Sequence, residues 1–94
     1  MEALKPSSAQ IKAHILYKLS RHRRWGGKHT ELINVRSALP REFQSQAEAI
    51  ARELADADLI TWLKKTGQIH ISLNPHRKKD IFDIIERYLG RQVW

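Results

Sequence analysis

The sequence predicts one α+β domain in which a three-helix core is followed by a two-stranded β-hairpin and an additional C-terminal helix. Ala, Leu and Ile recur at helical spacing between residues 45 and 58. Apolar and polar residues then alternate on both sides of Thr66-Gly67, which is the pattern of a hairpin. Asn74 and Pro75 mark the start of a further helix, and Gly90 marks its end.

Length and composition limit the class of protein. The 94 residues suffice for one domain with a small core, and 41% hydrophobic with 29% charged residues is typical of a folded protein. Because cysteine is absent, we expect neither disulfides nor thiolate metal sites, and a cytoplasmic location. No apolar run reaches the roughly 18 residues of a membrane span, and Met1–Lys5 lacks the apolar centre of a signal peptide, so we expect no membrane partner.

We divide the chain into a flexible N-terminus (1–7), one domain (8–90) and a C-terminal tail (91–94). A first helix is expected from a Ser7 or Ser8 cap to about Arg24, because apolar residues recur in it every three or four positions. A second helix, capped by Thr30, is expected to reach Leu39, although its β-branched residues leave a strand open.

Pro40 ends that second element, and residues 41–44 are expected to form a turn. The third helix is expected from Ser45 to Asp58, with Ser45 and Glu48 as a capping box.

The hairpin is expected to pair residues 60–64 with 68–73, with Ile71 on a buried face and both His70 and Ser72 on a solvated face. Two registers are open. A two-residue loop would pair Trp62 with Ile71 and bury the indole. A type I turn with Gly67 as a bulge residue suits Thr66 better and would turn Trp62 toward His70.

This order of elements resembles the winged-helix family of DNA-binding proteins. The strings at residues 27–30, 59–60 and 70–75 are similar to those of small archaeal winged-helix proteins, and the resemblance covers about residues 8–90. It implies that the third helix enters the major groove and that the hairpin, or wing, contacts the DNA backbone or minor groove. The matching positions around the third helix are Arg41, Gln44, Ser45, Gln46, Ala49 and Arg52.

Charge is distributed unevenly along the chain. The net charge of +7 attracts polyanions, nucleic acid first. Residues 44–58, however, carry four carboxylates against Arg52, a formal charge of −3 that is unusual for a recognition helix. The cations lie elsewhere, and phosphate binding would explain those that open the last helix, where the helix dipole disfavours them. These cationic groups are Arg23, Arg24, Lys28 and His29 after the first helix, Lys64 and Lys65 at the hairpin tip, and Arg77, Lys78 and Lys79.

No pattern of catalytic or metal-binding residues is present in the sequence. The five histidines show no paired spacing such as two histidines four apart on one helix. Asp80, Asp83 and Glu86 lie beside Lys79 and Arg87, which predicts an exposed, salt-bridged helix face. We therefore expect a protein that is not an enzyme and has no cofactor and no metal.

The apolar face of the last helix is wider than the core of a small domain can cover. This width predicts a homodimer. That face comprises Ile81, Ile84, Ile85, Tyr88 and Leu89, with Phe82 extending it. Val93 and Trp94 would extend the contact or fray.

The resulting hypothesis is a double-stranded DNA-binding protein, either a small dimeric transcriptional regulator or a chromosome-associated protein. One alternative is an adaptor in a larger complex, with the acidic third helix and Trp62 as its protein contacts. The other is a binder of structured RNA.

Overall fold

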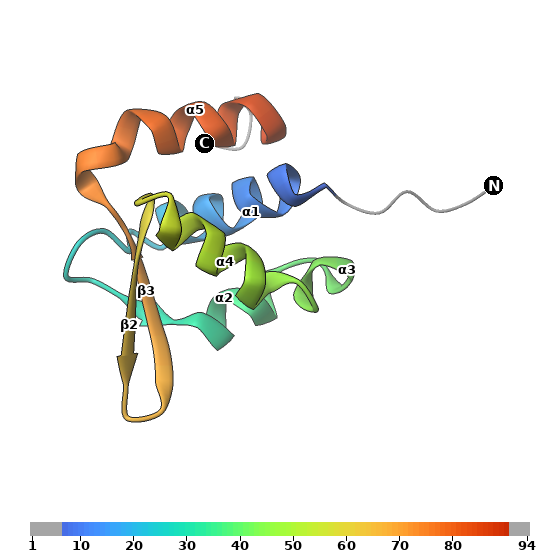
Figure 1. Cartoon of the computed structure of the whole chain (residues 1–94). Coiled ribbons are helices and arrows are strands. Elements are labelled where there is room, and N and C mark those ends of the chain that lie inside the picture. The colour runs from blue at the N-terminus through green and yellow to red at the C-terminus, as the bar shows by residue number, and fades with distance from the viewer. Residues whose placement is uncertain (1–6, 91–94) are drawn as a thin grey trace.

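Residues 7–90, the part of the chain that the computed structural model describes, form an α+β arrangement of helices around a three-stranded antiparallel sheet (Figure 1). The α-helices are α1 (Ser8–Arg21), α2 (Leu32–Ala38), α3 (Arg41–Gln44), α4 (Ala47–Asp56) and α5 (Lys78–Leu89), and a 3₁₀-helix, η1 (Pro75–Arg77), precedes α5. The strands are β1 (Thr30–Glu31), β2 (Ile60–Lys65) and β3 (Gln68–Leu73), in the order β1-β3-β2. The predicted flexible N-terminus up to residue 6 and the predicted tail, with Val93 and Trp94, lie outside the described residues.

Helix α1 begins as predicted and ends earlier than predicted. The Ser7 hydroxyl accepts from the Gln10 amide at 3.1 Å, and the Gln10 side chain accepts from the Ser7 amide at 3.2 Å, so a capping box starts the helix. The predicted end at Arg24 is wrong, because Arg23 adopts a φ of 57° and turns the chain out of the helix after Arg21.

Strand β1 is absent from the sequence prediction. Thr30 pairs with Ile71 and Glu31 with His70, so Thr30 belongs to a strand and does not cap the second helix, which begins at Leu32. A strand of this length leaves no alternating pattern in the sequence.

The predicted third helix is also corrected. Residues 41–44, expected as a turn, form the single helical turn α3, and α4 begins at Ala47. The predicted capping box of Ser45 and Glu48 is not formed, because the N-cap position belongs to Gln46 and no side chain bonds there.

The hairpin has the register with a two-residue loop. Lys65 pairs with Gln68, and Trp62 pairs with Ile71. Thr66 and Gly67 have φ values of 47° and 80°, as a type I′ turn requires, so the bulged alternative is wrong. The indole of Trp62 is half-buried.

The two faces of β3 differ from the predicted alternation. Ser72, expected on a solvated face, is fully buried, and the segment at Trp25 and Gly26 pairs with the edge of β3 beside it. Its hydroxyl donates to the Gly26 carbonyl and bonds the Thr61 hydroxyl, both at 2.7 Å. The segment after α1 is thereby fixed against the sheet.

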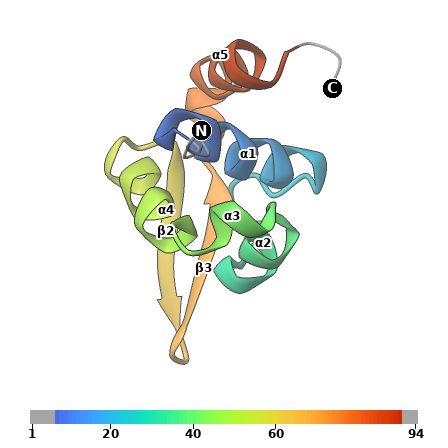
Figure 2. The ribbon, with the colours of Figure 1, turned by 90° about the vertical axis from the view of Figure 1, so that its right-hand side faces the viewer.

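Helix α1 lies at the centre of the core and contacts α2, α4, α5 and β3. Helix α5 lies on the opposite side of α1 from the hairpin tip, which projects beyond the helices (Figures 1 and 2). Within residues 7–90, no helix combines the length and the apolar character needed to traverse a bilayer.

Candidate nucleic-acid interface

Six of the predicted DNA-binding cations have no partner in the described part of the chain. None of them forms an ion pair, a side-chain hydrogen bond or a cation–π contact with another described residue. They come from the turn after α1, from α3 and from the hairpin tip, and all but the half-buried Arg24 are exposed. These free cations are Arg23, Arg24, Lys28, Arg41, Lys64 and Lys65.

Several other cations on the helices, in contrast, have contacts within the chain. Lys12 pairs with Glu53 at 3.2 Å, and the Arg21 guanidinium donates to the Tyr17 hydroxyl at 3.1 Å. Arg36 donates to the Gln44 carbonyl at 3.0 Å and so holds α2 against the end of α3.

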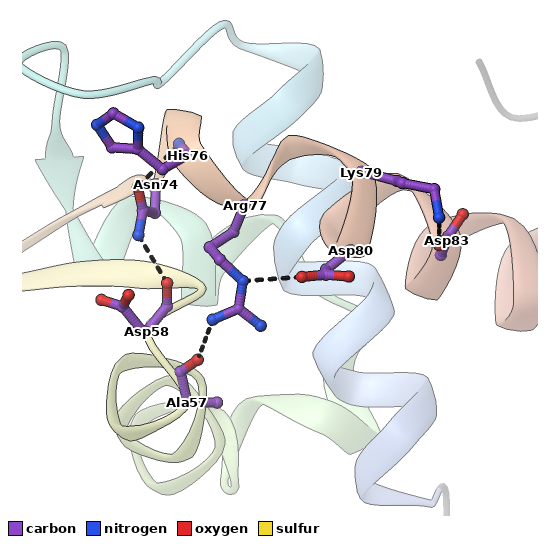
Figure 3. A network of polar contacts seen from close by, with 8 residues as sticks. All are labelled: Ala57, Asp58, Asn74, His76, Arg77, Lys79, Asp80 and Asp83. Atoms are coloured by element: carbon purple, nitrogen blue, oxygen red, sulfur yellow. Dashed lines mark hydrogen bonds and ion pairs between the residues drawn. The ribbon is translucent and has the colours of Figure 1, made fainter.

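The cations that open α5 follow the same rule (Figure 3). Arg77 lies between two elements, donating to the Ala57 carbonyl at the end of α4 at 3.0 Å and to the Asp80 carboxylate at 2.8 Å. Lys79 lies 3.9 Å from Asp83, and the Lys78 ammonium lies 5.3 Å from the centre of the Trp25 ring. These contacts give all three cations a role within the chain, and the phosphate interpretation of Arg77, Lys78 and Lys79 stays a prediction.

Asn74 joins the same two elements. Its side chain accepts from the His76 amide at 3.0 Å, which is the predicted cap of the last helical segment, here the 3₁₀-helix η1. The amide group also donates to the Asp58 carbonyl at 2.8 Å. One side chain therefore closes the end of α4 and starts the segment that leads into α5 (Figure 3).

Some of the residues predicted to contact DNA bases already have partners within the chain. Gln44 donates one amide hydrogen to the Leu39 carbonyl at 3.2 Å, which holds its side chain against the end of α2. Arg52 is exposed, and its guanidinium lies 4.8 Å from the centre of the Trp62 ring. Ser45 and Ala49 are exposed and Gln46 is half-buried.

An open groove of about 420 Å³ separates the helices from the hairpin tip. Arg36 and the exposed Glu48 contribute opposite charges to it, so the groove has no single-sign field. The residues that line it come from α2, the end of α3 and the turn after it, the start of α4 and the hairpin: Leu32, Ile33, Arg36, Gln44, Ser45, Glu48, Gly67, Gln68 and Ile69.

The basic turn, which we define as residues 22–29, runs beside β3. The Gly26 amide donates to the Leu73 carbonyl at 2.9 Å, and the Nδ1 atoms of His29 and His70 lie 3.1 Å apart. Lys64 and Lys65 lie at the tip, and at about 3.3 Å per residue the path along β3 from Ser72 to Gln68 is roughly 13 Å. Two groups of free cations are thus separated along one strand.

The predicted dimer surface is smaller than expected. Ile81 and Ile85 are fully buried in the core of the chain, where α5 packs on α1, so they are not available to a second copy. Ile84 and Leu89 are half-buried, and Tyr88 is 41% exposed. The prediction for Ile81 and Ile85 is therefore corrected, and Phe82 packs beside Trp25 at 5.8 Å between ring centres.

The contact between His29 and His70 could not be found from their spacing, because 41 positions separate them in sequence. Among the described residues, no three or more His, Cys, Asp or Glu side chains are grouped as metal ligands. A scan against protein-family models found no match for this chain, and neither did searches of curated proteins and of solved structures.

Proposed function

We propose that this chain binds double-stranded DNA as a winged-helix protein, mainly through phosphate contacts from the hairpin tip and the basic turn. The observation that carries the proposal is the division between free and engaged cations. Arg23, Lys28, Lys64 and Lys65 are exposed without described partners, whereas the cations of α1 and α5 described above are engaged within the chain. Unpaired, exposed cations are free to contact phosphate oxygens.

The topology supports the proposal. A helix leads through β1, α2 and α4 into the β2–β3 hairpin, and the first strand pairs with the last to give the order β1-β3-β2. This connectivity is compatible with a small winged-helix fold, in which the wing projects past the helices as the hairpin tip does here (Figure 1).

The length of β3 between the basic turn and the hairpin tip supports phosphate contacts on both sides of a groove. The path of roughly 13 Å between the basic turn and the tip is close to the width of about 12 Å of the major groove. Glu48 and the engaged Gln44 disfavour extensive base contacts by α4. We therefore propose that most of the affinity is independent of base sequence, for a small regulator or a chromosome-associated protein.

We also propose that the chain forms a homodimer, through a smaller surface on α5 than the sequence predicts. The surface left for a second copy on α5 comprises Ile84, Tyr88 and Leu89. Sedimentation at about 100 micromolar tests it by mass action, with Tyr88→Lys as the variant expected to dissociate a dimer. A monomeric unmutated chain would exclude the dimer and leave monomeric DNA binding as the proposal.

The decisive experiment is a duplex titration at several salt concentrations. If about six cations contact phosphates, log K should fall with log salt with a slope near −5. Lys64→Ala with Lys65→Ala should weaken binding to all duplexes alike and reduce the slope by about 2.

The matched control is Lys78→Ala with Lys79→Ala, which removes the same charge from α5. It should leave the slope nearly unchanged. Equal losses in both double variants would refute a hairpin interface. Failure to retain any duplex at about 50 mM salt would refute DNA binding.

A second candidate function is a protein adaptor, favoured by two exposed apolar side chains. Leu63 is 45% exposed in β2 and Ile33 is 54% exposed on α2. Salt-insensitive capture of one protein, lost in Leu63→Ser and without duplex retention, would favour the adaptor. Preference for a structured RNA over duplex DNA in the same titration would favour RNA.

A further inference from the structure

Two histidines from distant parts of the sequence meet beside β3. The Nδ1 atoms of His29 and His70 lie 3.1 Å apart, and their rings are nearly perpendicular with centres separated by 4.9 Å. Both side chains are half-buried. They are therefore fixed enough to act together and open enough to be reached from solvent.

Strand pairing explains how they meet. Glu31 lies opposite His70 in the β1–β3 ladder, so the side chains of these two residues share one face of the sheet. His29 lies just before β1, and its contact with His70 places its ring beside that same face. Three potential ligands, two imidazoles and one carboxylate, thus originate from adjacent positions at that face.

The separation of the two nitrogens suits a shared cation as well as a shared proton. Without metal, one imidazole donates Nδ1–H to the other, and each ring keeps Nε2 for solvent. With Zn–N bonds of about 2.0–2.1 Å, tetrahedral geometry places two ligand nitrogens about 3.3 Å apart. A change of a few tenths of an ångström and a rotation of the rings would convert one arrangement into the other.

Glu31 is the third ligand that strand pairing brings within reach. Residues directly opposite on antiparallel strands have Cβ atoms about 5 Å apart, so a rotamer of Glu31 can place its carboxylate beside His70. The described residues do not group three ligands in the structure as it stands, so the carboxylate must turn to complete the site.

We propose that His29 and His70 chelate a divalent transition-metal ion of the Zn²⁺ class, with Glu31 and water completing its coordination. Imidazole and carboxylate ligands suit Zn²⁺, Ni²⁺ and Cu²⁺ better than Ca²⁺ or Mg²⁺. A bound ion would join the basic turn to the middle of β3. This proposal does not depend on DNA binding, and its test uses no nucleic acid.

The direct test follows the histidine ring nitrogens of the unmutated protein by NMR during a Zn²⁺ titration, near pH of about 7.5, where most imidazoles are neutral. Saturable shifts of the Nδ1 resonances of both His29 and His70 at one equivalent are expected. No shift of this pair, or shifts confined to other histidines, would overturn the proposal.

Variants give an independent measurement by calorimetry. His29→Ala and His70→Ala should each weaken Zn²⁺ binding by more than the roughly 10- to 100-fold that loss of an outer-sphere partner costs, and Glu31→Gln by about tenfold. The matched control is His76→Ala, which removes an exposed imidazole from η1 and should leave the affinity unchanged. Unchanged binding in His29→Ala, or an equal loss in His76→Ala, would contradict the site.

Discussion

The helical body and the β3 side of the molecule use their cations differently. Around α1 and α5, cations hold elements together, as Arg77 does between the end of α4 and Asp80. At the hairpin tip and in the basic turn, Lys28, Lys64 and Lys65 have no described partner. The comparison teaches that total charge is a poor guide to an interface, because cations with internal contacts are less available to a polyanion than cations without them.

The largest expected effect is a loss of stability when the packing of α5 on α1 in the helical body is weakened. Ile81→Ala removes a fully buried side chain between α5 and α1 and should lower the free energy of unfolding by about 2–5 kcal/mol. Urea denaturation measures it, with the half-buried Ile84→Ala as the milder control. Duplex affinity should stay unchanged under conditions where the variant is folded. A selective loss of affinity at full folding would place α5 in the interface and break the comparison.

A second prediction compares a strong and a weak internal contact of two cations within the body itself. Arg77→Ala should lower the free energy of unfolding by about 1 kcal/mol, because it leaves the Ala57 carbonyl without its donor. Lys79→Ala should change it little, since the 3.9 Å pair with Asp83 is exposed. Equal stabilities of the two variants in denaturant titrations would show that the Arg77 contacts contribute nothing.

A third prediction concerns the conformation of the hairpin tip. Thr66 is β-branched and has a φ of 47°, so Thr66→Asn should raise the free energy of unfolding by roughly 0.5–1 kcal/mol. The reciprocal change, Gly67→Ala at a φ of 80°, should lower it by about 1 kcal/mol. Neither alters charge, so the salt slope of DNA binding should persist in both. Destabilisation by Thr66→Asn would exclude the type I′ turn.

The smallest effect is a pH dependence within the body. Burial, with a smaller contribution from Lys18, lowers the pKa of His14 below its usual 6.5. The unfolded chain then takes up a proton more readily than the folded chain, so this residue reduces stability as pH falls from 6.5 through the folded pKa. His14→Gln should remove that part of the decline in thermal unfolding experiments. A decline of the same size in the variant would assign it to other groups.

Long periodic segments were predictable from sequence, and contacts between distant segments were not. The start of α1, the hairpin and the Asn74 cap follow from local rules that act within a few residues. Strand β1 exists because β3 offers it a free edge, and its two residues carry no local signal. The same holds for Ser72, whose burial depends on a segment 46 positions away.

The candidate interface was predicted in part for the same reason. Clusters such as Arg23-Arg24 and Lys64-Lys65 are visible in the sequence, and the structure leaves them without described partners. Sequence could not show that Gln44 donates to Leu39 or that Ile85 is covered by α1, because both depend on packing. The exposure of cations was therefore predictable where their side chains have no tertiary contacts.

The buried hydroxyl of Ser72 determines which part of the hairpin can change in length. Ile71 lies in the core on one face of β3, and Ser72 bonds the Gly26 carbonyl and Thr61 on the other. Slippage by one residue would exchange these faces, so the base of the hairpin fixes its own register without help from the tip. The loop between Lys65 and Gln68 is accordingly a place where the two strands can be lengthened together, giving the hairpin a longer reach on an unchanged scaffold.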